Sequence, residues 1–385
     1  MKKILISSNT SWFIYNFFRT TIKEFMGDGR QVYILAPKDA YSEKLSALGC
    51  HFYPMSVDRS GAKLTVEFKT ILQFYSTIKI IKPDCLLNFT PKMNIYGAVI
   101  GRLLNIPVIN SVAGLGSIFT EKGFKPRIGK LLLRLTQPLV NHIIFQNPDD
   151  RQVYLEHHFV KAKHTSRVHG IGIDLKSFKA HSAPDDNVVR FILVARMLKN
   201  KGVIEFVKVA ERIRDKYLAK DEASSDFVKC EFSLLGFIDE DNPQGISRST
   251  LIRWDQERNV RYLGKTDDVY SVVKNYDCVV LPSYYREGIP QCLIEACAMA
   301  KPVITTDNVG CRETVEDQIT GIKIPCRNVE ALEDAMQKII DMSHQERLNL
   351  GINGRLKAEK EFCHLNIAKH YLLMIDALLS NKKTK

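Results

Sequence analysis

The chain has 385 residues, of which 45% are hydrophobic and 25% are charged. This length and composition are typical of a globular protein with two domains and exclude a disordered or collagen-like chain. The formal net charge is +12, but residues 1–180 carry a net +13 and the remainder a net −1. A basic N-terminal half favours an anionic partner such as a membrane, a nucleic acid or a polyphosphate ligand; a soluble domain that is simply basic is equally consistent.

The nine cysteines do not follow a metal-binding pattern. Cys292 and Cys297 are five residues apart in a predicted helix, which is not a zinc-ligand spacing. Unpaired cysteines in a large chain fit the reducing cytoplasm. The sequence contains no run of about 18 uncharged apolar residues, so we expect no membrane-spanning helix.

Short apolar runs of strand length alternate with helical patterns along the whole chain. In the first half the predicted strands are 3–7, 31–36, 84–89, 107–112 and 142–147. In the second half they are 189–195, 230–236, 260–264, 278–283, 302–306 and 321–325. Strands that alternate with helices form parallel sheets covered on both faces. The sequence therefore predicts an α/β protein with two Rossmann-like, doubly wound domains.

The predicted domains are residues 1–175 and 188–363, joined by a polar, turn-forming hinge at 172–187. Residues 364–385 contain an amphipathic helix that we expect to pack back toward the first domain. In such sheets, ligands bind beyond the carboxyl ends of the strands. We therefore expect the functional residues in loops that follow strands, in a cleft where the two domains face each other.

Two stretches of the second domain carry the candidate chemistry. "RMLKNKG" (196–202) places Arg196 and Lys201 after a strand and before a helix, where two cations suit a diphosphate. A solvated basic turn explains this stretch equally well on its own. "EGIPQCLIE" (287–295) places Glu287 in a loop and Glu295 in the following helix. Such carboxylates accept hydrogen bonds from sugar hydroxyl groups.

The loop before the second glutamate suits an anion. Gly288 permits close approach of a ligand to the backbone, and Pro290 is expected in the first turn of the helix. The amides of Gly288 and Ile289 then face the ligand. Surface solvation is the usual role of a single glutamate, but it explains the whole arrangement poorly.

These motifs resemble the donor site of the family 4 retaining glycosyltransferases, which have the GT-B fold. The resemblance covers nearly the whole chain and includes "HGIGIDLKSF" (169–178), "LLGFIDEDNP" (234–243), "VRYLGKTDDV" (260–269) and "TDNVGCRETVEDQITG" (306–321). Other motifs are similar to the branch of the family that extends undecaprenyl-diphosphate-linked sugars, including N-acetylgalactosaminyltransferases. They are "FTPKMNIYG" (89–97), "VAGLGSIFT" (112–120) and "IFQNPDDR" (144–151).

The resemblance implies a role for each motif residue. Arg196 and Lys201 would neutralise the nucleotide diphosphate as it leaves, which makes them catalytic together with Glu287, whose carboxylate would bind hydroxyls of the donor sugar. Glu295 would bind the ribose, and the amides after Glu287 the distal phosphate. Further donor contacts are expected from Gly236, Gly264, Lys265, Pro290, Asn9, Ser11 and Trp12. The family retains the anomeric configuration and needs neither a metal nor a cofactor; the UDP-sugar is a co-substrate.

The first domain departs from the family pattern in two places. The loop after the first strand, "SSNTSWF" (7–13), lacks the usual Gly-Gly pair, and "NSVAGLG" (110–116) lacks a histidine that many members have. The N-domain polar group near the reacting carbon thus stays unassigned. Acceptor contacts are expected from Arg59, Lys92, Gly114 and Gly116. Asp239–Glu240–Asp241 is expected to be a solvated acidic loop rather than a metal site.

The basic first half has a candidate partner in an anionic bilayer. "EKGFKPRIGKLLLRL" (121–135) interleaves cations with apolar residues, as in helices that lie in a membrane interface. An ordinary amphipathic helix that packs its leucines inward is equally consistent.

We therefore expect a metal-independent enzyme that moves a hexose or N-acetylhexosamine, with GalNAc the best guess, from a UDP-sugar to an undecaprenyl-diphosphate-linked sugar. Such an enzyme would act in bacterial lipopolysaccharide, O-antigen or capsule assembly, at the cytoplasmic face of the membrane. The alternatives are a transferase with a soluble acceptor and a non-catalytic anion- or nucleotide-binding protein. Nucleic acid is not expected as a partner.

Overall fold

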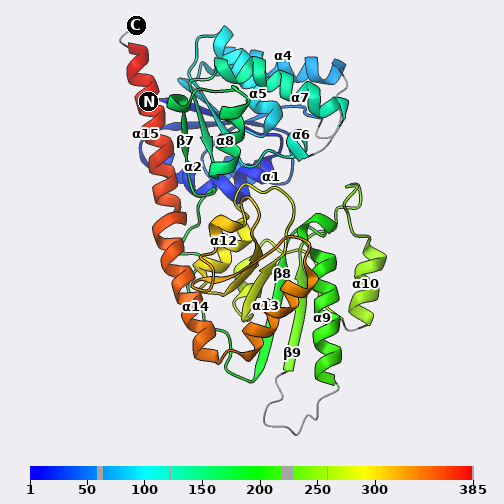
Figure 1. Ribbon diagram of the computed structural model, residues 1–385. Coiled ribbons are helices and arrows are strands. Elements are labelled where there is room, and N and C mark those ends of the chain that lie inside the picture. The colour runs from blue at the N-terminus through cyan, green and yellow to red at the C-terminus, as the bar shows by residue number, and fades with distance from the viewer. Residues whose placement is uncertain (59–63, 121–122, 219–228, 258, 384–385) are drawn as a thin grey trace. The chain divides into compact units, whose positions relative to one another are not determined.

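The computed structural model describes residues 1–58, 64–120, 123–218, 229–257 and 259–383. The chain forms two compact units (Figure 1). The first contains Met1–Gly172 and Cys363–Lys385, and the second contains Ile173–Phe362. Each unit contains one parallel β-sheet, which confirms the predicted α/β class.

The sheet of the first unit has seven described strands in the order β3-β2-β1-β4-β5-β6-β7. They are β1 (Lys3–Ser7), β2 (Gln31–Ala36), β3 (His51–Pro54), β4 (Cys85–Phe89), β5 (Val108–Val112), β6 (His142–Phe145) and β7 (Thr165–Arg167). The strand order reverses between β1 and β4, which is the position where doubly wound sheets bind ligands. The short strands β3 and β7 were not predicted because their partly exposed, polar residues do not form an apolar run.

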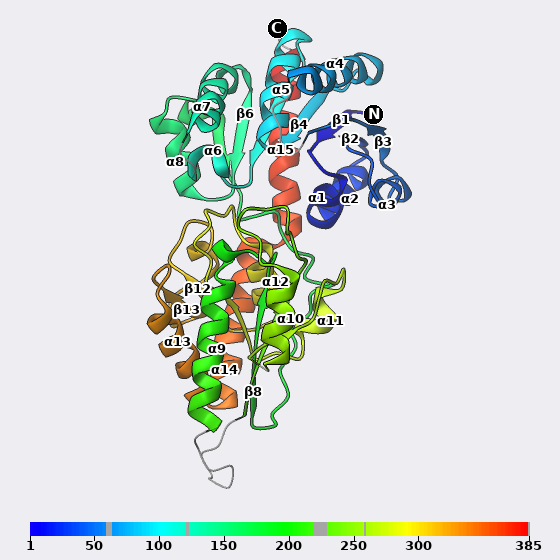
Figure 2. The ribbon, with the colours of Figure 1, turned by 90° about the vertical axis from the view of Figure 1, so that its right-hand side faces the viewer.

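Helices cover both faces of this sheet because alternate strand residues point to opposite faces (Figures 1 and 2). Ile4 and Ile6 of β1 pack into one core, and Leu5 packs into the other. The first core is completed by α1 (Ser11–Phe13), a π-turn (Ile14–Phe18), α2 (Arg19–Gly27), α3 (Ser42–Ala47) and α15 (His364–Lys383). The second core is completed by α4 (Leu64–Ile81), α5 (Pro91–Leu103), α6 (Ser117–Thr120), α7 (Phe124–Thr136) and α8 (Pro148–Glu156).

Helix α15 is fastened to the first unit at three points along its length. The Asp376 carboxylate accepts hydrogen bonds from Arg30 (2.8 Å) and Lys2 (2.9 Å). The hydroxyl groups of Tyr371 and Ser111 lie 2.9 Å apart. The His370 ring contacts the Ser166 hydroxyl group (2.7 Å). Helix α15 is therefore an integral part of the first unit.

The second unit has a sheet of six described strands in the order β10-β9-β8-β11-β12-β13. They are β8 (Val188–Val194), β9 (Lys229–Leu235), β10 (Arg261–Tyr262), β11 (Cys278–Leu281), β12 (Val303–Thr306) and β13 (Gly321–Ile324). Phe191 lies in the core beneath α9 (Val203–Leu218), α10 (Arg248–Gln256) and α13 (Val329–Asp341). Ile192 lies in the opposite core with α11 (Val269–Val273) and α12 (Gln291–Ala298).

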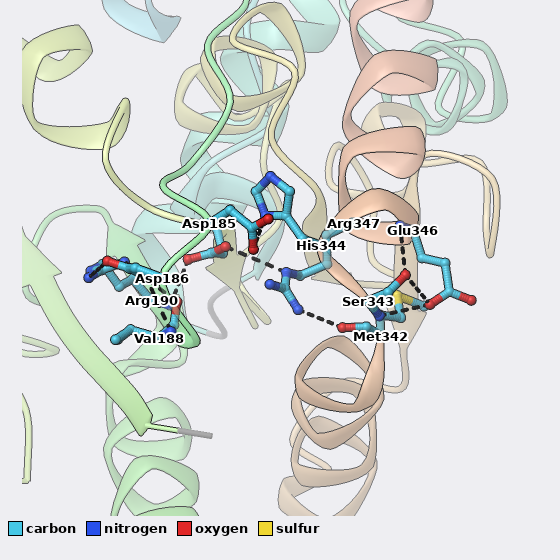
Figure 3. A network of polar contacts seen from close by, with 10 residues as sticks. Asp185, Asp186, Val188, Arg190, Met342, Ser343, His344, Glu346 and Arg347 are labelled. Carbon is cyan, nitrogen blue, oxygen red and sulfur yellow. Dashed lines mark hydrogen bonds and ion pairs between the residues drawn. The ribbon is translucent and has the colours of Figure 1, made fainter. Parts of the chain in front are cut away.

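A polar network at the amino-terminal end of β8 holds α14 (His344–Lys357) in place (Figure 3). Ser343 and Glu346 form a reciprocal capping box at the start of α14. Arg347 donates to the Met342 carbonyl (2.6 Å) and pairs with the buried Asp277 carboxylate (3.5 Å). These contacts fix one end of the sheet.

The segment after the first unit is also bonded within the second unit. Arg355 of α14 donates to the carbonyls of Phe178 (2.7 Å) and Leu175 (3.5 Å). The His181 amide donates to the Met299 carbonyl (3.1 Å).

One predicted strand is shorter than expected. Strand β10 has two residues instead of the expected five, 260–264, because the chain turns at Leu263 toward Gly264. In the described parts of the chain, none of the helices is long and apolar enough to cross a membrane.

We predict that acid weakens the first unit through His142. Burial, with smaller effects of His370 and His164, lowers the pKa of His142 to about 4 from its usual 6.5. The unfolded chain then binds the extra proton first, so stability falls as pH drops through about 6.5 toward about 4. At pH 5 the free energy of unfolding should be about 2 kcal/mol lower than at pH 7.5.

Urea denaturation at the two pH values measures this difference. The His142→Gln variant, which removes the titrating ring, should show a smaller difference. An unchanged pH dependence in that variant would assign the effect to other groups.

Candidate functional site

The candidate donor site lies at the carboxyl edge of the second sheet, where β8 and β11 are neighbours and the strand order reverses. The loops after these two strands contain both charged stretches singled out from the sequence. Parallel strands bring such loops to the same edge of the sheet. The second unit thus gathers residues that are almost 90 positions apart in the chain.

The turn after β8 depends on a glycine. Lys199–Lys201 form a single 3-10 turn, and Gly202 has a φ of 78° that is strained for any other residue. A Cβ atom at Gly202 would lie 2.3 Å from the Pro282 carbonyl oxygen. Helix α9 therefore begins at Val203. Only glycine lets the turn lie directly against the loop that follows β11.

The two loops are joined by backbone and side-chain contacts. The Asn200 carbonyl accepts hydrogen bonds from the amides of Tyr284 (3.0 Å) and Tyr285 (3.1 Å). The ammonium group of Lys201 forms an ion pair with the Glu287 carboxylate, which also accepts a hydrogen bond from the Ser283 hydroxyl group (3.1 Å). Both members of the ion pair are largely buried, with 12% and 11% of their side chains exposed.

A third loop, after β12, forms hydrogen bonds with the loop that contains Glu287. The Glu287 amide donates to the Val309 carbonyl (3.3 Å), and the Asn308 side chain donates to the Tyr285 carbonyl (2.8 Å). Gly310 has a φ of 85°, and a Cβ atom there would lie 2.2 Å from the Gly288 carbonyl oxygen. Sequence reasoning did not assign these residues a role; the glycine within "TDNVGCRE" was the available signal.

The helix after Glu287 begins one residue later than expected. Pro290 precedes the first turn of α12, with an extended ψ of 122°, and Gln291 is the first helical residue. Gly288 and Ile289 are buried beside it. Glu295 lies on α12, as predicted, and is half-buried.

The neighbouring thiol of Cys292 reports how the charges are arranged. Burial raises its pKa, and the charges of Glu295, Lys201 and Glu287 each act on it in addition. The structure therefore brings these three side chains around one point of α12. The mixture of one cation and two carboxylates can receive a phosphate on one side and hydroxyl groups on the other.

Arg196 lies at the same sheet edge but has a different partner. Its guanidinium group donates to the Asp239 carboxylate (3.2 Å), and 41% of the side chain is exposed. Glu240 accepts a hydrogen bond from the Arg248 amide (2.8 Å). The acidic loop thus engages protein groups, and no cluster of three metal-ligating side chains occurs among the described residues.

The remaining donor-site predictions in the second unit lie next to one another. The Gly236 amide, after β9, donates to the Gly264 carbonyl (2.8 Å), and Lys265 is exposed beyond it. They form the rim of the carboxyl edge after β9 and β10.

The residues expected after β1 in the first unit differ in accessibility. Trp12 is 37% exposed and Asn9 is half-buried. Ser11 is fully buried, and its hydroxyl group donates to the Pro37 carbonyl (2.5 Å). The Ser11 side chain therefore holds the loop in place. The geometry does not favour a direct contact between its hydroxyl group and a ligand.

The residues that were expected to contact the acceptor also differ from one another in their surroundings. Lys92 donates to the Glu67 carboxylate (2.5 Å) and the Asp58 carbonyl (2.6 Å), so its charge is already paired. Gly114 lines a cavity at the carboxyl ends of β4 and β5, and Gly116 follows in the same loop. Arg59 lies outside the described residues.

Two family models match the chain, one to each unit. Residues 3–147 match "Glycosyl transferase 4-like", and residues 174–357 match "Glycosyl transferases group 1". The second match contains Arg196, Lys201, Glu287 and Glu295.

The chain is also similar to individual bacterial glycosyltransferases. The chain is 26% identical to the N,N'-diacetylbacillosaminyl-diphospho-undecaprenol alpha-1,3-N-acetylgalactosaminyltransferase of Campylobacter jejuni, with 96% of each chain covered. It is 22% identical to the UDP-Gal:alpha-D-GlcNAc-diphosphoundecaprenol alpha-1,3-galactosyltransferase of Escherichia coli, with 72% of each covered. It is 26% identical to the capsular polysaccharide biosynthesis glycosyltransferase CapM of Staphylococcus aureus, with 87% of each covered.

Solved structures show the same fold at lower identity. A sucrose-phosphate synthase from Thermosynechococcus elongatus has a TM-score of 0.81 at 18% identity, covering 99% of this chain and 100% of that one. The Anabaena protein HepE, in complex with UDP and glucose, has a TM-score of 0.78 at 15% identity, covering 98% and 100%.

We predict that the ion pair between Lys201 and Glu287 stabilises the second unit. Lys201→Met leaves a buried carboxylate without its cation and should lower the free energy of unfolding by about 1–3 kcal/mol. The double variant Lys201→Met/Glu287→Gln removes both charges and should recover most of that loss. Urea denaturation of the two single variants and the double variant measures the coupling. A Lys201→Met protein as stable as the native chain would show that the pair does not form.

Proposed function

Since the chain is a glycosyltransferase with the GT-B fold, we propose that it transfers a hexose or N-acetylhexosamine from a UDP-sugar to an undecaprenyl-diphosphate-linked sugar. The observation that carries the proposal is the ion pair of Lys201 and Glu287 at the strand-order reversal of the second sheet. N-Acetylgalactosamine is the best candidate for the sugar. The C. jejuni protein, which is similar along almost its whole length, is named as an N-acetylgalactosaminyltransferase.

Different side chains of the second unit bind different parts of the donor. Lys201 and Arg196 supply positive charge for the diphosphate, which gains negative charge as the glycosidic bond to it breaks. Lys201 is held in place by Glu287 before the donor arrives, so its position costs little to organise. Glu287 accepts hydrogen bonds from hydroxyl groups of the transferred sugar, and Glu295 from those of the ribose.

Backbone groups complete the proposed donor site. The amides of Gly288 and Ile289 lie just before α12, where the positive end of the helix dipole favours an anion. Gly236, Gly264 and Lys265 form the rim that meets the base. We assign no side chain as a nucleophile: the acceptor hydroxyl group attacks, and the leaving phosphate takes its proton. The reaction then retains the anomeric configuration and requires no metal.

We predict that UDP binds and that Arg196 stabilises the diphosphate as it leaves. Arg196→Ala keeps the ion pair at Glu287 intact and should lower kcat by about 10²-fold, because half of the charge stabilisation of the leaving diphosphate is lost. Isothermal titration with UDP and GDP, followed by a transfer assay, measures binding and turnover separately. Arg253→Ala, which removes an arginine 65% exposed on α10 and not assigned to the donor site, is the matched control and should lose far less.

The same assay tests the chemistry. The NMR coupling constant of the new anomeric proton reports the configuration of the product, and turnover after EDTA treatment reports any requirement for a metal. An inverted product, a metal requirement, or the absence of UDP binding would each contradict the corresponding part of the proposal. Activity on soluble sugars that equals activity on lipid diphosphate sugars would favour the soluble-acceptor alternative.

We also propose that the first unit lies on the anionic cytoplasmic face of the membrane, where a lipid-linked acceptor is presented. Helix α7 exposes an apolar face: Phe124 is 77% exposed, Leu131 55% and Leu135 61%. Of its four leucines only Leu133 is buried, so inward packing does not account for the other three. Residues 121–122 of the predicted basic stretch lie outside the described residues.

Charges flank this apolar face of α7. Arg127 and Arg134 are exposed between the leucines, and cations at such positions attract anionic lipids. Exposed leucines combined with arginines are the pattern of a helix that lies in a membrane interface.

We predict that the double variant Leu131→Gln/Leu135→Gln binds anionic vesicles about tenfold more weakly than the native chain, because two apolar side chains no longer enter the bilayer. Flotation with phosphatidylglycerol vesicles at low and high salt measures this binding. Leu356→Gln, a leucine 58% exposed in the second unit, is the matched control. Equal flotation of native and double-variant proteins would exclude α7 as the contact surface.

A further inference from the structure

A second ligand position lies within the first unit, at the point where the strand order of its own sheet reverses. A cavity of about 150 Å³ opens at the carboxyl ends of β4 and β5. Its walls come from the start of the chain, from the loop after β4, and from the segment after β5. All of these residues belong to one compact unit. Doubly wound sheets bind their ligands at such a reversal.

The loop after β4 is held in a strained conformation at Thr90. Its φ of 73° and ψ of 147° are unfavourable for a β-branched residue and cost about 1–3 kcal/mol. Thr90 occupies the N-cap position of α5, but its hydroxyl group does not cap the helix. Within the described structure this buried hydroxyl group has no hydrogen-bond partner. Neither the strained backbone of Thr90 nor its unpaired hydroxyl group stabilises the fold. Such features are typical of a residue that binds a ligand.

The next polar wall residue, one turn further along α5, is Asn94. Its side chain is 3% exposed, and its Nδ2 donates to the Ser111 carbonyl (3.2 Å). This bond fixes the orientation of the amide and directs Oδ1 the other way. Among the described residues, Oδ1 of Asn94 has no hydrogen-bond partner. An unpaired buried acceptor costs about 1–3 kcal/mol, so a ligand N–H that reaches it gains more than it would in water.

Most of the other residues that line the cavity are apolar, although Ser111 and Tyr154 also lie in its wall. Its walls include Phe13, Val112, Leu115, Ile118 and Leu133. Among the described residues no lysine or arginine lines it, so these residues offer a phosphate no countercharge. A sugar hydroxyl group would pair with one of the two oxygens but would leave the apolar walls without a partner.

One common substituent matches all three properties. An acetamido group presents an N–H for an acceptor, a carbonyl oxygen for a hydroxyl donor, and a methyl group for an apolar wall. We propose that this cavity binds the acetamido group of the acceptor sugar, with Asn94 Oδ1 accepting from its N–H and the Thr90 hydroxyl group donating to its carbonyl. This inference rests on the proposed function for the identity of the acceptor, but the cavity chemistry stands without it.

The geometry makes Thr90 a selective probe. Thr90→Val keeps the shape of the side chain and its branched Cβ, and removes a hydroxyl group that has no partner in the described protein. No protein hydrogen bond is lost, so its thermal midpoint should be equal to or higher than that of the native chain. Thr90→Ser keeps the hydroxyl group and is the matched control.

The first measurement is binding by saturation-transfer NMR, using methyl N-acetyl-α-glucosaminide and methyl α-glucoside as probes. We expect the acetyl methyl protons to receive the strongest saturation, and the glucoside to bind about tenfold more weakly or not at all. Thr90→Val should weaken binding of the acetylated probe by about five- to tenfold, whereas Thr90→Ser should stay within about twofold. Equal binding of the two probes, or unchanged binding by Thr90→Val, would overturn the assignment.

The second measurement separates this inference from the proposed function. Transfer from a UDP-sugar is compared on two short-chain polyprenyl diphosphate acceptors that carry either a 2-acetamido or a 2-hydroxy sugar. A preference for the acetamido acceptor that disappears in Thr90→Val supports both ideas. Equal transfer to both acceptors rejects the cavity assignment and keeps the function. No transfer to either acceptor, together with selective probe binding, rejects the lipid-linked acceptor and keeps the cavity.

Discussion

The second unit depends on a contact between two loops that are far apart in the chain. Lys201 and Glu287 can pair only because β8 and β11 are neighbours and end at the same edge of the sheet. The pair is largely buried, and the desolvation of two charges is repaid only with good geometry and further hydrogen bonds. The Ser283 hydroxyl group donates such a bond to the Glu287 carboxylate, and the bonds of the Tyr284 and Tyr285 amides to the Asn200 carbonyl hold the two loops together. A charged site is thus assembled before any ligand is present.

Close backbone approach makes this assembly possible. Gly202 lets one loop lie against Pro282, and Gly310 lets another lie against Gly288. A side chain at either position would displace Lys201 or Glu287 from its partner. The site is therefore determined as much by the absence of two Cβ atoms as by the charges themselves.

The two units present different chemical groups at the same topological position. In the second unit the strand-order reversal carries cations and carboxylates, which suit a nucleoside diphosphate and hydroxyl groups. In the first unit the equivalent position carries neutral oxygens on Thr90 and Asn94 and apolar walls. The first suits the charged donor, and the second suits a neutral substituent of a sugar. This difference is consistent with separate roles for the two units.

Much of the protein was predictable from local patterns in the sequence. Buried parallel strands are continuous apolar runs, so most strands and the doubly wound α/β class followed from β1, β4, β8 and β11. The spacing of Glu287 and Glu295 and the basic turn at Arg196 indicated a nucleotide-sugar site. Partly exposed elements such as β3 and β7 were missed because their residues do not form an apolar run.

Only the tertiary structure decided which polar groups are paired and which are not. From the sequence, Lys92 was expected to contact the acceptor and Ser11 the donor. In the structure, Lys92 instead pairs with the Glu67 carboxylate, and the Ser11 hydroxyl group donates to the Pro37 carbonyl. Thr90 and Asn94 lie within the motif "FTPKMNIYG" but received no individual role from the sequence, yet their side-chain oxygens have no hydrogen-bond partner among the described residues. Sequence determines the chemistry that each residue offers, whereas partners far along the chain determine whether that chemistry is left for a ligand.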